Sequence, residues 1–153
     1  MRQVVISDTS CLILFEKIGR LELLKATFGA VAVTEQVADE YGLLPDWIEV
    51  KSLIDKQLFD ELRMELGNGE ASSIAFATEI EDCLLIIDER KGRKKAEELG
   101  LAIIGSLGVL LRAKQKGVIE SLLEVLHEIE KTDFRISESI KEKLLGEAGE
   151  FYL

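Results

Sequence analysis

The sequence predicts a single α/β domain: a mostly parallel central sheet of four to five strands with helices on both faces, as in a Rossmann-like three-layer sandwich. Short runs of β-branched and aliphatic residues alternate with stretches of helical periodicity, which favours a parallel sheet. The length of 153 residues suits one domain, and 47% hydrophobic with 31% charged residues is typical of a globular protein. No linker interrupts the chain, so we expect one domain over 1–153, with 119–153 as a C-terminal helical extension.

Each expected strand is a short, continuous apolar run, as in strands that are covered on both faces. Such runs occupy 4–7, 30–33, 84–87 and 101–104, and residues 47–50 are either a further strand or an extended link. The last of the four runs is expected to be buried. The sequence therefore places strands along most of the chain, separated by helical segments.

The expected helices begin at capping residues and end at glycines. Thr9 and Ser10 offer N-caps for the first helix, Thr34 for the third and Ser137 for the last. The helical segments that this pattern predicts are 9–18, 21–28, 35–41, 57–66, 70–79, 89–99, 109–116, 119–129 and 138–145. This alternation completes the predicted α/β pattern.

Acidic residues follow two of the predicted strands. Asp8 ends the first strand and Asp88 ends the run at 84–87, so a parallel sheet places both at one edge, where ligands bind. Two interpretations stay open, because each Asp is also a suitable N-cap for the helix that follows it. Glu70 begins a helix after the Gly67–Gly69 turn, and Glu40 lies near the end of another. Helix-dipole placement for Glu70 and a solvated face for Glu40 are their simpler explanations.

Four carboxylates without a neighbouring cluster of His or Cys suit hard cations such as Mg²⁺ or Mn²⁺. A site of this kind can activate water and neutralise phosphate during hydrolysis. The lone His127 excludes a zinc constellation and a Ser-His-Asp set, and we expect it to be structural or exposed. Cys11 and Cys83 are expected to be small core residues.

Several short motifs, in this order between residues 4 and 119, resemble the PIN-domain family, and within it the small stand-alone prokaryotic proteins of a toxin–antitoxin nuclease-like subgroup. The motifs are SDTS (7–10), VTEQVADE (33–40), GNGEA (67–71) followed by IA (74–75), IIDER (86–90) and IGSLGVLL (104–111). The resemblance implies a PIN-like fold and a divalent-metal-dependent ribonuclease that hydrolyses RNA by metal-activated water. It also implies a homodimer and, for many small relatives, a toxin role with an antitoxin partner.

Carried over motif by motif, the resemblance implies that the catalytic and metal-binding acids are Asp8, Glu40, Glu70 and Asp88. The hydroxyl group of Ser10 or Thr9 would lie near the metal. Glu70 stands where the family often has Asp, and Glu89, directly after Asp88, is a further candidate ligand.

A basic run, Arg90, Lys91 and 93–95, occupies the first turns of the helix after Asp88. Cations at this end oppose the helix dipole, so local stability does not explain the run. We interpret Arg90, Arg93 and Lys94, together with Ser10, as contacts to substrate phosphate. A solvated charged face with intrahelical ion pairs is the alternative.

The formal net charge of −10 argues against a nonspecific polyanion binder, so the local basic run matters more than the total. An N-terminus without an apolar stretch, only two Cys and no membrane-length apolar run predict a cytoplasmic protein without membrane contact. The apolar end 151–153 is expected to pack on the domain or a partner. Two other functions stay open: a non-catalytic PIN-like module that binds RNA or protein, and a receiver-like phosphoacceptor domain, although no Lys follows the last strand.

Overall fold

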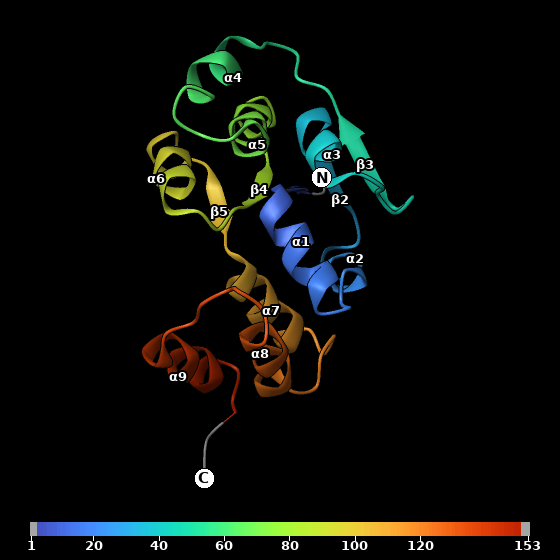
Figure 1. The fold of residues 1–153 in the computed structure, drawn as a ribbon, viewed down its shortest axis with the longest axis vertical. Helices are drawn as coiled ribbons and strands as arrows, with labels where there is room; N and C mark the ends of the chain where they lie inside the picture. Colours follow the sequence, from blue (N-terminus) through green and yellow to red (C-terminus); the bar gives the residue numbers. More distant parts are fainter. Residues whose placement is uncertain (1–2, 151–153) are drawn as a thin grey trace.

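Five short strands form one all-parallel sheet in the computed structural model, which describes residues 3–150 (Figure 1). The strands are β1 (Val4–Ser7), β2 (Val31–Thr34), β3 (Ile48–Lys51), β4 (Cys83–Ile86) and β5 (Ala102–Ile104), in the order β3-β2-β1-β4-β5. This confirms the predicted α/β class, and residues 47–50 do contribute a strand. The order differs from the 2-1-3-4-5 order of the receiver fold, which removes that alternative.

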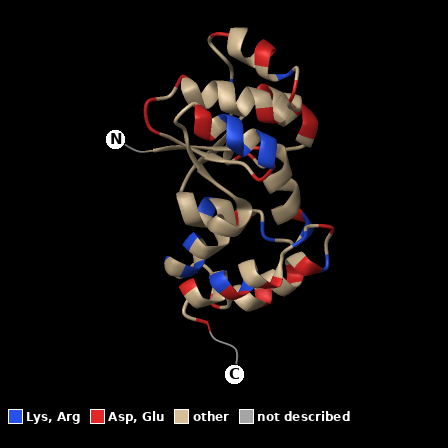
Figure 2. Ribbon diagram, turned by 90° about the vertical axis from the view of Figure 1, so that its left-hand side faces the viewer, with Lys and Arg blue, Asp and Glu red and all other residues tan. Residues whose placement is uncertain are grey.

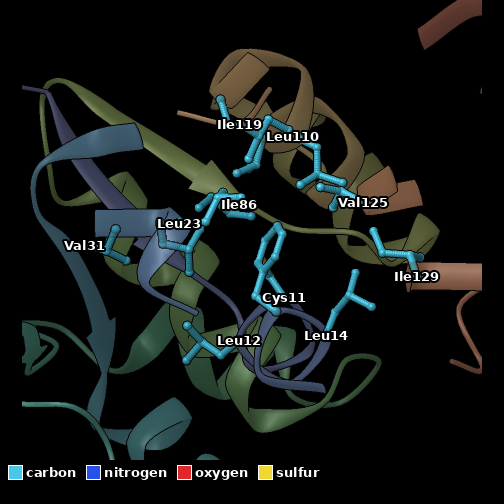
Figure 3. Close-up of a cluster of buried hydrophobic side chains, with 14 of the residues drawn as sticks. Cys11, Leu12, Leu14, Leu23, Val31, Ile86, Leu110, Ile119, Val125 and Ile129 are labelled. Carbon is cyan, nitrogen blue, oxygen red and sulfur yellow. The ribbon is translucent and has the colours of Figure 1, made fainter. Parts of the chain in front are cut away.

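Alternate side chains of the central strands β1 and β4 enter two different cores, because successive residues of a strand point to opposite faces. On one face, Val5 and Ile86 join the core formed with α1 (Thr9–Lys17), α2 (Glu22–Phe28), α7 (Ser106–Gln115), α8 (Leu122–Glu130) and α9 (Glu138–Glu147). Figure 3 shows part of this core gathered between the sheet and the C-terminal helices. On the other face, Ile6 and Leu85 pack with α4 (Gln57–Leu62), α5 (Asn68–Thr78) and α6 (Arg90–Glu98).

The remaining helix, α3 (Glu35–Tyr41), begins at Thr34, whose hydroxyl oxygen accepts a hydrogen bond from the Val37 N–H at 3.1 Å. Val37 is buried in the first core, and α3 also contacts α5 across the sheet edge. The predicted cap at Thr34 is therefore confirmed, as is the cap at Ser137. The helices α8 and α9 share the first core, and the division of the chain into a domain and an extension at 119–153 stays a prediction.

Several predicted boundaries were wrong for identifiable reasons. The first helix is capped by Asp8, not by Thr9 or Ser10, which lie inside it. The helix predicted over 57–66 ends at Leu62, after which backbone bonds of the i to i+3 type form a tighter turn. Helix α5 begins two residues early at Asn68, α7 three residues early at Ser106, and α8 three residues late, after the cap at Ser121.

The strand predicted as buried over 101–104 is a sheet edge with partly exposed residues, because only β4 pairs with it. Cys11 and Cys83 are buried and unbridged, as predicted. His127 is exposed on α8, which is one of the two positions predicted for it, structural or exposed. In the part of the chain that the structure describes, no helix is long and apolar enough to span a membrane. The packing predicted for 151–153 lies outside the described residues.

The order in which the chain adds strands reverses between β1 and β4, although all five strands are parallel. From β1 the chain builds outward through β2 to β3, then returns to add β4 and β5 on the other side. The two central strands pair directly, with Ser7 opposite Ile86. Loops that follow such a pair leave a crevice at their carboxyl ends, which is the usual ligand position in open α/β sheets.

Candidate active site

Asp8 lies at this edge of the sheet, directly after β1, and only 1% of its surface is exposed. Its Oδ1 accepts a hydrogen bond from the Cys11 N–H at 2.9 Å, so it caps α1, while its buried Oδ2 has no partner. Burial raises the pKa of Asp8 to about 7, and the nearby charges of Asp88 and Glu40 add to this rise, while the backbone N–H groups of Cys11 and Asp88 oppose it. Asp8 is thus both a cap and a poorly solvated carboxylate, and capping alone does not account for its second oxygen.

Asp88 follows β4 on the same edge and is half-buried. Its Oδ1 accepts the Ser106 N–H at 2.7 Å and its Oδ2 accepts the Ser106 hydroxyl at 2.5 Å. Asp88 therefore caps α7, which follows the neighbouring strand β5, and not the helix α6 that follows Asp88 in sequence. The Arg93 guanidinium donates to the Ile87 carbonyl at 2.9 Å, and both Arg93 and Asp88 lie about 3 Å from the position of an added Gly105 Cβ.

Glu40 reaches the site from the last turn of α3. Its side chain is exposed, but its Oε1 accepts the N–H of Gly69 at 2.5 Å, in the first turn of α5. An added Cβ at Gly69 would lie 2.8 Å from that oxygen and 2.8 Å from the hydroxyl of Thr9, which is buried without a hydrogen-bond partner. Glu40, Gly69 and Thr9 are therefore packed together, with no room for a side chain at position 69.

Glu70, the next residue of α5, is half-buried, and its Oε2 is buried without a hydrogen-bond partner. Burial raises the pKa of Glu70 to about 7, and the neighbouring carboxylates of Glu89 and Asp8 raise it further. Gly92 of α6 leaves space for this side chain, since an added Cβ would lie 2.8 Å from Oε2. The structure thus places Glu89 beside Glu70.

The four predicted acids share one electrostatic neighbourhood. Asp88 and Glu40 raise the pKa of Asp8, and Asp8 raises that of Glu70. Oxygen donors and two buried, unpartnered carboxylate oxygens fit a hard divalent cation in their chemistry. The ligand set is not assembled, however: Glu40 and Asp88 are bound to N–H groups, and within residues 3–150 no three His, Cys, Asp or Glu side chains are placed to hold a metal.

A family model whose description is a PIN domain matches residues 4–150 of the chain. The chain belongs to the PIN-domain family. No curated protein and no solved structure gave a match. PIN domains are generally nucleases, act on nucleic acid and typically use divalent metal ions. The match confirms the resemblance inferred from the motifs, while the roles of individual residues stay predictions.

The basic run of this PIN domain lies on α6, which begins two residues after Asp88, and its Lys and Arg residues are coloured blue in Figure 2. Within residues 3–150, the only ion pair of this run is Lys95 with Glu98, at 3.3 Å. Arg90, Arg93 and Lys94 line a hollow of about 450 Å³ together with Asp88. Ser10 is exposed on α1 and lines a different hollow, so the structure does not group it with the basic run.

Four further residues position the acids of the PIN domain, and the sequence analysis assigned a role to none of them. Ser106 binds Asp88 through two donors, while Gly69, Gly92 and Gly105 lie where a Cβ would meet Glu40, Glu70 and Asp88. A glycine in the middle of a charged helix, as at position 92, is a sequence signal of close approach. No such sequence signal marks the contact of Ser106 and Gly105 with Asp88, because Asp88 follows a different strand.

Proposed function

We propose that this PIN domain is an endoribonuclease that hydrolyses RNA phosphodiester bonds with Mg²⁺ or Mn²⁺. The observation that carries this proposal is Asp8: a carboxylate at the sheet's switch point, 1% exposed, with one buried oxygen unpartnered and three other acids nearby. Such an arrangement costs the fold stability, since burial disfavours the charged form. A divalent cation is the partner that offsets this cost, and nucleases are the family's general activity.

In this proposal Asp8, Glu70 and Asp88 would hold the metal and Glu40 would complete the acidic set, with Glu89 beside Glu70 as a further ligand. A bound divalent cation lowers the pKa of water and neutralises charge on the phosphate. Ser106 keeps the Asp88 carboxylate oriented through its N–H and hydroxyl groups, and the Gly69 N–H fixes Glu40.

The substrate would be held by cations on the outer side of the acids. Arg90, Arg93 and Lys94 line the hollow next to Asp88, and three donors there can bind phosphate oxygens. The exposed hydroxyl of Ser10, on the α1 side, is the fourth proposed phosphate contact.

Cleavage of a labelled single-stranded RNA tests the proposal. We expect cleavage with Mg²⁺ or Mn²⁺, none with chelator, and loss of activity in Asp8→Asn and Glu40→Gln. Asp39→Asn is a matched control, because Asp39 is an exposed carboxylate that precedes Glu40 on the same helix. Full activity in Asp8→Asn would show that the acids are not the catalytic site.

A non-catalytic module that binds RNA or protein is the second candidate. It is favoured by one observation, that the described residues contain no three metal-ligating side chains brought together. Calorimetric titration with Mn²⁺ distinguishes the two functions. Binding that is lost in Asp8→Asn supports the nuclease, whereas a flat titration of the unsubstituted protein supports the module.

We add three further points to this proposal, which rest on the resemblance to small prokaryotic PIN proteins: a toxin role, an antitoxin partner and a homodimer. A small co-transcribed DNA-binding protein in the neighbouring reading frame would support the toxin role. Growth arrest on expression, relieved by Asp8→Asn or by that neighbour, is the expected result. Analytical ultracentrifugation tests the homodimer.

A further inference from the structure

The loop between α8 and α9 carries Phe134 and Arg135 to the carboxyl edge of the sheet. Figure 1 shows this loop next to the link between β5 and α7. A hollow of about 590 Å³ lies there, lined by Phe134 and Arg135 together with Asp88, Arg93 and Gly105. A segment about 45 residues from Asp88 in sequence thus borders the proposed catalytic acids.

Arg135 is exposed and, within the described residues, forms no hydrogen bond and no ion pair within 4 Å. Its neighbour Asp133 forms its ion pair with Lys17, at 3.1 Å, and Arg135 acts on Asp133 only as a nearby charge that helps to lower its pKa. Arg93 and Arg135 line the same hollow, so it carries two guanidinium groups. An anion between them, such as a phosphate, would bind both through the planar fork of each guanidinium.

Phe134 lies between two hollows. Besides the one that contains Asp88, it lines a second hollow of about 270 Å³ with Ser10 and Lys17. The ring is half-buried against the first core, and the Phe134 N–H is held by the Thr132 hydroxyl at 3.1 Å. A fixed, partly exposed aromatic ring beside cations is the usual platform for an unpaired base of a single-stranded nucleic acid.

We propose that Phe134 and Arg135 bind single-stranded RNA next to the acidic site, with a base stacked on Phe134 and a phosphate held between Arg135 and Arg93. This inference rests on the proposed ribonuclease function and deepens it by naming two further residues, outside the acidic set and the basic run, that would contact the substrate. Stacking on Phe134 needs a base that is free of its pair, so duplex RNA does not satisfy this site. Phe134 and Arg135 are therefore specificity residues, and Asp8 and its partners remain the catalytic ones.

Binding is measured separately from cleavage, by fluorescence anisotropy with a labelled, unstructured single-stranded RNA and with the same sequence as a duplex, in chelator and at several salt concentrations. Arg135→Ala should weaken binding of the single strand roughly tenfold and reduce the salt slope by about one. Phe134→Leu should weaken it roughly fivefold or more with the slope unchanged, since a stacked base is lost but no charge. Both variants should bind the duplex as the unsubstituted protein does.

Lys131→Ala is the matched control, because Lys131 is an exposed cation shortly before the same loop and lines neither hollow. Equal losses in Lys131→Ala and Arg135→Ala, equal losses for duplex and single strand, or no binding by the unsubstituted protein would overturn the inference. Thermal unfolding shows whether Phe134→Leu retains its fold, and Arg135→Ala tests the same site without a core change. RNA bound through this loop but never cleaved would overturn the hydrolytic function alone; cleavage unaffected by either variant would overturn this inference alone.

Discussion

Replacing Gly69 by Ala tests whether Glu40 is held in place by the start of α5. Gly69 has no positive φ, so Ala fits its backbone, but the added Cβ would lie 2.8 Å from both Glu40 Oε1 and Thr9 Oγ1. Thr9 is buried in α1 and has little freedom, whereas Glu40 is an exposed, flexible side chain. The carboxylate of Glu40 is therefore the group that moves, and its hydrogen bond to the Gly69 N–H is lost.

The magnitude follows from two opposing contributions. A hydrogen bond to a charged group contributes about 1.5–3 kcal/mol, and exposure of Glu40 favours the lower end. Ala in place of Gly in a helix gains roughly 0.5–1 kcal/mol. We expect a net loss of at least about 0.5–1.5 kcal/mol in the free energy of unfolding, or roughly 1–6 °C in Tm for a chain of this size, because the 2.8 Å approach of the new Cβ to Thr9 Oγ1 adds strain to these two contributions. Cleavage should fall about tenfold or more, since tenfold corresponds to about 1.4 kcal/mol of transition-state stabilisation.

Gly146→Ala in α9 is the control, because an added Cβ there has no atom within 4 Å. It should raise the free energy of unfolding by roughly 0.5–1 kcal/mol and leave cleavage unchanged. Urea denaturation in chelator measures stability, and initial rates on labelled RNA with Mn²⁺ measure activity. If Gly69→Ala gains stability as Gly146→Ala does and retains full activity, Glu40 is not positioned by Gly69 and has no part in the site.

Three other substitutions test the site and its support. Burial raises the pKa of Asp8 from 3.8 to about 7, so the metal-free protein should lose stability as pH rises from about 4 to 7. Asp8→Asn should make this decrease smaller in urea denaturation, and an unchanged pH profile would contradict the raised pKa. Ser106→Ala removes the hydroxyl that donates to Asp88 but keeps the backbone N–H, and it should slow cleavage about tenfold and weaken Mn²⁺ binding in calorimetry. An unchanged Mn²⁺ affinity would argue against Asp88 as a ligand. Glu150→Gln weakens the carboxylate cap on the Leu122 N–H and should lower the free energy of unfolding by about 1 kcal/mol near neutral pH, with a smaller difference in acid; a difference that grows in acid would contradict the role of the Glu150 charge.

The position of Asp8 and Asp88 could be predicted from the sequence because it follows from local rules. Each acid ends an apolar run, and the carboxyl ends of parallel strands share one edge. The structure confirms that the two strands pair directly. Glu40 and Glu70 are different, since helical periodicity says nothing about which helix ends meet. Their assignment came from the family resemblance, and the contact that joins α3 to α5 is the 2.5 Å hydrogen bond of Glu40 to the Gly69 N–H.

What the sequence could not show depends on contacts between distant segments. A cap on the helix that follows Asp88 was one of two interpretations left open, but Ser106, beyond the next strand, supplies two donors to its carboxylate. The capping role expected of Thr9 and Ser10 belongs to Asp8, because a carboxylate directly after the strand already lies above the first N–H groups of α1. No sequence pattern marks Phe134 and Arg135, because their loop lies at the sheet edge through the packing of α7, α8 and α9, which the sequence does not show.

The chain has a formal net charge of −10, and the charged residues at this edge of the sheet are arranged in a way that local stability does not explain. Acids with raised pKa values lie at this edge. Within residues 3–150, four cations of α6, namely Arg90, Lys91, Arg93 and Lys94, form no ion pair and lie near the positive end of their own helix dipole. Neutralisation between the two sets would relieve both, yet within residues 3–150 no ion pair within 4 Å joins Asp8, Glu70 or Asp88 to the basic run. Separate acidic and basic groups at one edge of the sheet can bind a metal cation and a phosphate anion at the same time. This local arrangement of the two kinds of charge, more than the net charge, decides whether an acidic protein can act on RNA.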